Sequence, residues 1–224
     1  MCGRFALTLP ADAMAQLFDA AMANDLPDVP NYNICPTNQV IALTAHDGGR
    51  RMTSMRWGFM PHWYKTPADG PLLINARAES LAEKPAFRAA ARARRCLIPA
   101  TGFYEWTKDQ NGARLPWYIA PSDREFLCFA GVWQIWDKGA HPLATCAIVT
   151  CAANATLGQI HHRMPVILEA ADWPLWLGEA GHGAATLMKA APDQALSFHR
   201  VDKAVNSNRA QGPALIEALA DDEH

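Results

Sequence analysis

The cysteine at position 2, directly after the initiator methionine, carries the most distinctive chemistry in the sequence. A small residue here is expected to let methionine aminopeptidase remove Met1, which would leave Cys2 with an α-amine beside its thiol. The pKa of an α-amine lies near 7.7–8.0, against about 10.4 for lysine, so part of it is a neutral nucleophile at neutral pH. Such an amine can form a Schiff base with an aldehyde, and the thiol can then close a thiazolidine ring. The alternative is an incidental small residue at a frayed terminus.

Three further positions have side chains suited to proton transfer or hydrogen bonding. Glu105 lies among aromatic residues in a predicted strand, where a carboxyl group is suited to proton transfer, unless it is an ordinary solvated glutamate. His161 and His162 are adjacent, so in an extended stretch they face opposite sides and at most one enters a site. A structural role is the alternative for both. Asn75 offers an amide that donates and accepts hydrogen bonds, or it is a turn residue.

Arginines and aromatic residues are the candidates for binding a polyanion. Arg4, Arg77 and Arg163 could each hold a phosphate with two hydrogen bonds, although surface or ion-paired arginines look the same in a sequence. Trp63 and Tyr64 lie in an irregular stretch, where their rings either stack on bases or pin the loop onto the core. Both interpretations stay open on the residues alone.

The charge balance limits how nucleic acid could be bound. The chain has 224 residues and a formal net charge of −2, so there is no global positive field and any polyanion contact must be local. A basic cluster on the predicted helix Pro85–Arg95 is either a solvated helix face or a DNA-facing surface. It consists of Arg88, Arg92, Arg94 and Arg95.

The six cysteines do not indicate a metal site or a disulfide framework. No CxxC pair occurs, and the thiols in apolar runs are expected to fill the core. Cys146 and Cys151 with the two histidines match no standard zinc spacing, so we predict neither a metal nor a cofactor. No apolar segment reaches the roughly 18 residues of a membrane span, and the first residues lack a secretory signal pattern. We therefore expect a cytoplasmic protein without membrane contact.

Local patterns predict an α+β fold: one domain over residues 1–224, with a mainly antiparallel, barrel-like sheet and peripheral helices. A hairpin turn is expected at Asn111-Gly112 and a long loop at Trp57–Leu72. Half of the residues are hydrophobic, which is enough for a sizeable core. The expected strands are Gln39–Thr44, Arg51–Trp57, Cys96–Pro99, Gly102–Lys108, Trp117–Ile119, Phe126–Trp133 and Ala144–Thr150. The expected helices are Ala11–Ala23, Pro85–Arg95, Asp172–Leu177, Ala184–Ala190 and Pro213–Leu219.

Six short blocks in a fixed order resemble the SRAP (SOS response-associated peptidase) family of abasic-site processing proteins. The blocks extend from the N-terminus to Pro165, and Ala204-Val205-Asn206 with Gln211-Gly212 resembles the C-terminal segment of the family. They are Met1-Cys2-Gly3-Arg4-Phe5, Tyr32-Asn33-Ile34-Cys35-Pro36, Trp57-Gly58-Phe59-Met60-Pro61, Ile74-Asn75-Ala76-Arg77-Ala78-Glu79, Gly102-Phe103-Tyr104-Glu105-Trp106 and His161-His162-Arg163-Met164-Pro165.

The resemblance implies the SRAP fold and a cofactor-free reaction with abasic sites in single-stranded DNA. Cys2 would form a covalent DNA–protein crosslink, because the abasic sugar opens to an aldehyde. Asn75 would hold the sugar or the cysteine, Glu105 would transfer protons, and His161 would protonate the sugar ring oxygen. The resemblance places Arg4, Arg77 and Arg163 on DNA phosphates, and Trp63 and Tyr64 near the lesion.

Two details depart from the family pattern. His162 stands where an acidic residue is common, and the loop between Tyr64 and Asn75 carries extra residues, Ala68-Asp69-Gly70. An AP-lyase step by β-elimination and peptidase activity limited to release of Met1 are also consistent with the resemblance. The chain is expected to act as a monomer in the DNA-damage (SOS) response, associated with the nucleoid when bound to DNA.

Two other function classes remain open. An amidotransferase-like glutaminase shares the Met-Cys-Gly start, but it leaves the later blocks unexplained. A non-covalent binding module would shield damaged single strands, and Cys2 would then be dispensable. Retention of DNA binding and protection by Cys2→Ala would favour the module, and glutamine turnover would favour the amidotransferase.

Overall fold

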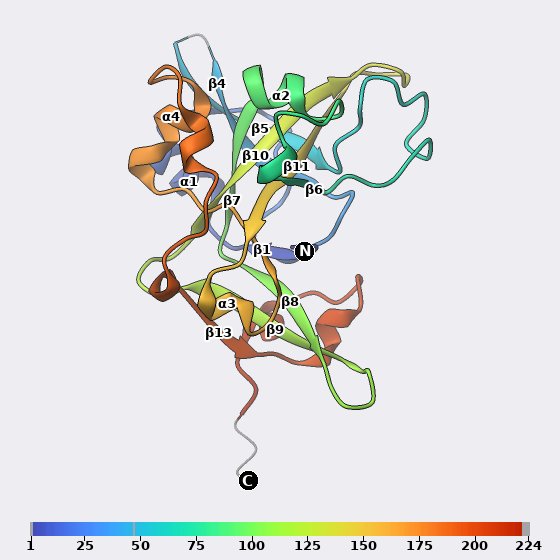
Figure 1. Ribbon diagram of the computed structural model, residues 1–224, viewed down its shortest axis with the longest axis vertical. Helices are drawn as coiled ribbons and strands as arrows, with labels where there is room; N and C mark the ends of the chain where they lie inside the picture. Colours follow the sequence, from blue (N-terminus) through green and yellow to red (C-terminus); the bar gives the residue numbers. More distant parts are fainter. Residues whose placement is uncertain (1, 47, 221–224) are drawn as a thin grey trace.

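Two β-sheets form the framework of the protein in the computed structural model, which describes residues 2–46 and 48–220 (Figure 1). The larger sheet has eight strands in the order β12-β11-β10-β7-β4-β5-β2, with β6 paired to β11. Its strands are β2 (Ala20–Met22), β4 (Gln39–His46), β5 (Gly49–Trp57), β6 (Asn75–Arg77), β7 (Arg95–Ala100), β10 (Leu127–Trp136), β11 (Leu143–Ala152) and β12 (Arg163–Pro165).

Five strands of the larger sheet form a closed ring. Neighbours β11, β10, β7, β4 and β5 pair antiparallel, and β5 then returns to β11 through the parallel pairs Thr145↔Arg56 and Cys146↔Trp57. The central strands have continuous buried runs such as Val40–Leu43, because both of their faces are covered. The barrel-like, mainly antiparallel sheet and the α+β class predicted from the sequence are confirmed.

The smaller sheet has five antiparallel strands in the order β13-β9-β8-β1-β3. The β8–β9 hairpin turns at the predicted position, where Gly112 adopts the left-handed φ of 80° that glycine accommodates without strain. In Figure 1 this sheet occupies the lower half of the molecule, with β1 at its border with the barrel. Its strands are β1 (Phe5–Leu7), β3 (Asn31–Ile34), β8 (Gly102–Lys108), β9 (Arg114–Pro121) and β13 (Leu196–Arg200).

Short helices lie around the sheets. The α-helices of the described residues are α1 (Ala11–Leu17), α2 (Arg88–Ala93), α3 (Ala155–Gly158) and α4 (Trp173–Leu177). The 3-10 turns are η1 (Ala78–Ser80), η2 (Ala170–Asp172), η3 (Ala184–Leu187), η4 (Asp193–Ala195), η5 (Lys203–Asn206) and η6 (Pro213–Ile216).

Four helix predictions were too long. The helix expected over Pro85–Arg95 forms only at Arg88–Ala93, and Arg95 already belongs to β7. The helix expected over Ala11–Ala23 ends at Leu17, because Asp19 adopts a positive φ of 48° and the next residues pair with β5 as strand β2. The segments expected to be helical at Ala184–Ala190 and Pro213–Leu219 form only single 3-10 turns. Tertiary pairing and turn geometry here override a weak local helical preference.

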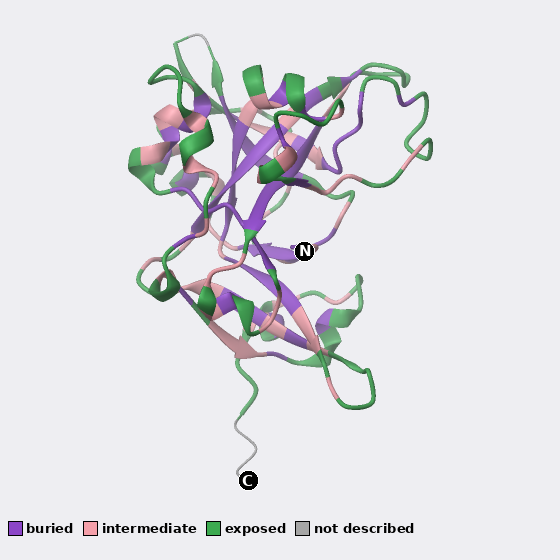
Figure 2. Cartoon of the chain, in the orientation of Figure 1, coloured by how far each residue is buried: buried purple, intermediate pink, exposed green. Residues whose placement is uncertain are grey.

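Strand β1 is fixed against the barrel by an aromatic cluster in the buried interior that Figure 2 shows in purple. The Phe5 ring lies edge-on to Trp57 at 5.1 Å and to Phe129 at 6.0 Å between centroids, so it contacts β5 and β10. Phe103 of β8 contacts Phe129 in the same way, at 5.9 Å. Such edge-to-face pairs add to the stabilisation from apolar burial. The cluster therefore holds the residues just before Phe5 at the junction of the two sheets.

Candidate functional site

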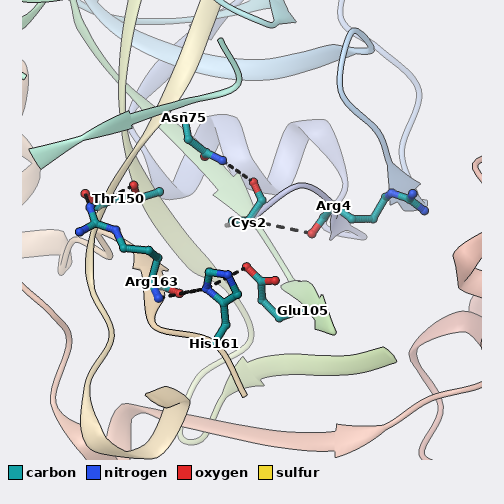
Figure 3. Close-up of polar contacts among 7 residues, drawn as sticks. All are labelled: Cys2, Arg4, Asn75, Glu105, Thr150, His161 and Arg163. Atoms are coloured by element: carbon teal, nitrogen blue, oxygen red, sulfur yellow. Dashed lines mark hydrogen bonds and ion pairs between the residues drawn. The ribbon is translucent and has the colours of Figure 1, made fainter. Parts of the chain in front are cut away.

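Cys2 lies just before β1 and is completely buried. Its carbonyl oxygen accepts a hydrogen bond of 2.9 Å from Asn75 Nδ2, and its Sγ lies 4.0 Å from the carbonyl oxygen of Arg4 (Figure 3). Asn75 is positioned by the parallel pairing of β6 with β11, where it lies opposite Ile148. Asn75 Oδ1 is buried and has no hydrogen-bond partner among residues 2–46 and 48–220, so one end of the amide holds Cys2 and the other is available.

Glu105 reaches the same place from the smaller sheet. It lies in β8, which pairs with β1 through Phe5↔Phe103, and only 4% of it is exposed. Burial raises the pKa of the Cys2 thiol far above its usual value, and the negative charge of Glu105 raises it further. This environment favours the neutral thiol at physiological pH.

His161 completes the cluster from the connection between α3 and β12. Its Nδ1 lies 3.9 Å from Glu105 Oε1 and accepts a 3.0 Å hydrogen bond from the backbone N–H of Arg163. His161 and His162 were expected to face opposite sides only in an extended stretch. They instead precede β12, and their rings stack with centroids 4.4 Å apart. His162 is exposed, and the charge of His161 is the main cause that lowers its pKa.

The four residues predicted to be catalytic thus come together from four separate segments (Figure 3). An amide holds the main chain of Cys2, and a carboxyl group and an imidazole approach from the other sheet and from the segment before β12. This arrangement can position a nucleophile and move protons to and from it. Among the described residues no group of three or more His, Cys, Asp or Glu side chains could hold a metal ion.

The predicted phosphate-binding arginines differ in what they contact. Arg4 is 7% exposed, and its guanidinium donates to Asn33 Oδ1, the Val205 carbonyl and Asn208 Oδ1 at 2.7, 2.8 and 2.5 Å. These contacts tie β1 to β3 and to the C-terminal segment. Arg77 is exposed on β6, two residues from Asn75, and is the predicted arginine best placed to meet a phosphate.

The two predicted stacking residues also differ. Trp63 is 47% exposed, whereas Tyr64 is 7% exposed and its hydroxyl donates to the Pro71 carbonyl at 3.3 Å. Trp136 Nε1 donates to the Tyr64 carbonyl at 2.7 Å, which further fixes this part of the loop. Trp63 is therefore available to a ligand, and Tyr64 pins the loop.

The arginines of the predicted basic cluster have two kinds of environment. Arg88 and Arg94 line an open cavity of about 550 Å³ together with Trp63 and Trp133. Arg95 instead donates to backbone carbonyls of the α2 segment and of Trp176. The sequence pattern had left a solvated helix face and a DNA-facing surface open, and for Arg88 and Arg94 the DNA-facing role stays a prediction.

Two features near the site were not predicted from the sequence. Trp106, next to Glu105, lies under the Arg114 guanidinium at 4.5 Å and lines a second cavity of about 310 Å³ with Lys108. Two signals could have indicated this role: its place after Glu105, and the hairpin pairing of β8 with β9.

Glu79 forms a bidentate ion pair with Arg163. In the sequence, only the spacing of Glu79 from Asn75 hints at this role.

The fold and the site define a class of protein: an α+β scaffold with a partly closed barrel, whose second residue is a cysteine among an amide, a carboxyl group and an imidazole. Residues 1–208 match the family model described as SOS response associated peptidase (SRAP), and the chain belongs to this family. The resemblance seen in the sequence blocks is therefore confirmed.

Similar proteins include several named as abasic site processing proteins. YoqW of Bacillus subtilis is 33% identical over 97% of this chain and 100% of its own length, and YedK of Escherichia coli is 29% identical over 98% and 100%. A solved structure from Bacteroides thetaiotaomicron superposes with a TM-score of 0.85 at 23% identity, covering 98% of this chain and 100% of that one, which shows a shared fold. No helix in the described residues is long and apolar enough to cross a membrane.

Proposed function

We propose that this protein processes abasic sites in single-stranded DNA by covalent capture on Cys2, after removal of Met1. The observation that carries the proposal is the convergence of Asn75, Glu105 and His161 on the first residue of the processed chain. The relatives named as abasic site processing proteins support the substrate class, because they match nearly the whole chain.

The chemistry needs no cofactor. The ring-opened abasic sugar presents an aldehyde, and the Cys2 α-amine adds to it and loses one water to give a Schiff base. The thiol sulfur then adds to the imine carbon, and the thiol proton ends on the ring nitrogen. The net reaction joins amine, thiol and aldehyde in a thiazolidine with release of one water.

The environment of the thiol favours this order of steps. In the chain that retains Met1, burial and Glu105 raise the pKa of the Cys2 thiol, which supports initial attack by the α-amine. We assign to Glu105 the thiol proton as sulfur adds to the imine, and to His161 protonation of the sugar oxygen during ring opening. Their 3.9 Å separation supports a shared role in proton transfer. The same raised pKa disfavours direct thiolate attack on an amide, which an amidotransferase would require.

The DNA strand is held by local contacts in this slightly acidic protein. Arg77 lies on the same short strand as Asn75, so a phosphate it binds adjoins the lesion. Trp63 offers an exposed ring for stacking on an unpaired base. Single-stranded DNA is the fitting substrate, because stacking needs unpaired bases. A role in the DNA-damage response, with an AP-lyase step and peptidase activity confined to Met1, completes the proposal.

Mixing purified protein with a single-stranded oligonucleotide that carries one abasic site, followed by a denaturing gel, tests the proposal. The N-terminus of each variant is checked by mass spectrometry. We expect a shifted band that requires both the lesion and Cys2. Cys2→Ala should abolish it, and Cys35→Ala, which removes another buried thiol, should retain it. An alanine inserted before Cys2 should also abolish it, because the α-amine becomes part of a peptide bond.

The other outcomes have clear meanings. A crosslink from the protein with the inserted alanine would exclude the thiazolidine route. Absence of a band from protein confirmed to lack Met1 would overturn covalent capture. Full protection of the lesion by Cys2→Ala would then favour a non-covalent binding module, and glutamine turnover would favour the amidotransferase.

A further inference from the structure

A cavity outside the catalytic cluster combines basic and aromatic side chains. It is open, has a volume of about 550 Å³ and is lined by Trp63, Arg88, Arg94, Trp133 and Ile135 among others. We call it the α2 groove, because helix α2 contributes one of its walls. None of the four predicted catalytic residues lines it, and none of its described lining residues is acidic. The α2 groove is therefore distinct from the catalytic site and positively charged.

The α2 groove is built from segments that hydrogen bonds fix to each other. The backbone N–H of Trp133 in β10 donates to the carbonyl of Arg94 at 2.9 Å, so the end of α2 lies beside this strand. Gln134 Nε2 donates to the carbonyl of Met60, which fixes the start of the loop that carries Trp63 to the same strand. Binding in such a preformed groove requires little ordering of the protein, which favours affinity.

The two arginines of the groove lack a carboxylate partner. Within residues 2–46 and 48–220, no ion pair or side-chain hydrogen bond involves Arg88 or Arg94. The Nε atom of Arg94 is buried without a hydrogen-bond partner there, and a buried donor left unpaired costs free energy. Arg124, by contrast, is paired with Glu169 at the surface. An anion in the α2 groove would compensate both the unpaired donor and the two positive charges.

Large apolar side chains are exposed at the same place. Trp63 is 47% exposed and Ile135 is 48% exposed. Trp133 and Ile135 lie on the outward face of β10, where they alternate with buried residues, and Trp133 is half-buried. Indole rings beside guanidinium groups suit single-stranded nucleic acid, because bases stack on the rings and phosphates bind the cations. The lining therefore fits a nucleotide better than a wholly apolar ligand.

The loop that carries Trp63 also connects the groove to the catalytic cluster. It leaves and rejoins the barrel at the bridge Phe59↔Leu73, where the Phe59 N–H donates to the Leu73 carbonyl at 2.9 Å. The chain then continues directly into β6, which begins with Asn75. In Figure 1, α2 lies at the top of the barrel and the N-terminus lies below it. A DNA strand bound at Cys2 can therefore continue past β6 toward the α2 groove.

We propose that the α2 groove is a second binding site for single-stranded DNA, which takes undamaged nucleotides away from the lesion. Phosphates of the strand bind Arg88 and Arg94, and a base stacks on Trp63 or Trp133. This inference rests on the proposed function, because it assigns the groove to the strand that is captured at Cys2. The groove contributes affinity and touches no reacting atom.

The salt dependence of binding to an undamaged single strand tests the arginines. Each phosphate contact on a single strand contributes about 0.7 to the slope of log affinity against log salt concentration. Arg88→Gln combined with Arg94→Gln should therefore lower this slope by about 1.4, an affinity loss of about 25-fold at about 0.1 M salt relative to about 1 M. Arg92→Gln is the matched control and should leave the slope unchanged. It removes a charge from an exposed position of the same helix that does not line the groove.

A strand without bases tests the stacking. Trp133→Leu should weaken binding of an undamaged strand about fivefold or more. It should leave unchanged the binding of a strand of tetrahydrofuran spacers, which has phosphates but no bases. Thermal midpoints are measured for every variant. An equal loss of affinity for both strands would show a structural role of Trp133 and overturn the stacking.

Two results would overturn the second binding site. One is a wild-type salt slope in the double arginine variant, as expected if the groove binds a protein partner instead. The other is an equal change of slope in Arg88→Gln and Arg92→Gln, as expected of a general electrostatic field. The crosslinking gel is run on the same proteins, so the two proposals are separable. A crosslink with a wild-type slope in the double variant rejects only the groove, and a lowered slope without any crosslink in the wild type rejects only capture.

Discussion

The hydrogen bond between Asn75 and Cys2 gives a prediction whose size follows from the structure. Asn75 Nδ2 donates to the Cys2 carbonyl at 2.9 Å, while Asn75 Oδ1 has no partner in the described part of the chain. Asn75→Ala leaves a buried carbonyl without this donor, which costs about 1–3 kcal/mol. If that free energy serves to hold Cys2 in its reactive position, the crosslinking rate falls between about 5-fold and about 150-fold.

Asn75→Asp adds a prediction about the order of the crosslinking rates. Asn75→Asp is nearly the same size, but it places a carboxylate oxygen against the Cys2 carbonyl oxygen, so its rate should fall below that of Asn75→Ala. The assay is single-turnover crosslinking at saturating DNA, with the thermal midpoint measured in parallel. Asp109→Ala is the control, because it removes side-chain bonds to the backbone only at the β8–β9 turn. Wild-type rates in a destabilised Asn75→Ala would refute the positioning role, and so would an Asn75→Asp that is faster than Asn75→Ala.

Four further predictions concern single side chains. Glu105→Gln should slow crosslink formation or reversal and leave single-strand affinity intact, as gel and binding assays would show; a large affinity loss would make Glu105 structural. Trp63→Ala should weaken single-strand binding by about 1–3 kcal/mol without changing the thermal midpoint. Tyr64→Ala, a buried aromatic deletion, should instead destabilise the fold by about 3–5 kcal/mol. The Arg163 hydrogen bond lowers the pKa of Glu79 below its usual 4.5, so the stability that Glu79 adds over Glu79→Gln should be full above that pH. It should disappear as the pH falls through the lowered pKa, and urea unfolding at a series of pH values would detect this.

The hairpin and the ring strands could be predicted from sequence because their signals are local. Strand β8 spans the predicted residues Gly102–Lys108, and the turn forms at Asn111-Gly112 as expected. The long strands were found with ends shifted by up to three residues, as at β9 and β10. Alternation, β-branched residues and turn glycines act within a few residues, so a sequence shows them directly.

The short strands and the roles of single side chains depend on distant partners. Strand β3 (Asn31–Ile34) is mostly polar, and its pairing with β1 makes it a strand. The Arg4 guanidinium donates to Asn208, which is 204 positions away, and no local pattern indicates this contact. No local pattern distinguishes Trp63 from Tyr64, because the difference lies in tertiary burial and in the bond from the Tyr64 hydroxyl to the Pro71 carbonyl. These contacts join residues that are distant in the sequence, so local propensity and periodicity do not predict them.

The site lies at the junction of the two sheets, so its side chains come from segments that only the tertiary fold brings together. Glu105 comes from the smaller sheet, while Asn75 comes from the barrel sheet and His161 lies just before one of its strands. Their geometry around Cys2 therefore depends on how the sheets are fixed to each other. The aromatic contacts of Phe5 with the barrel do part of this, and the buried guanidiniums of Arg4 and Arg163 tie neighbouring segments on either side. In a protein with net charge −2, these two arginines hold segments of the site together, and the exposed Arg77 and Trp63 are the groups for which we propose contact with DNA.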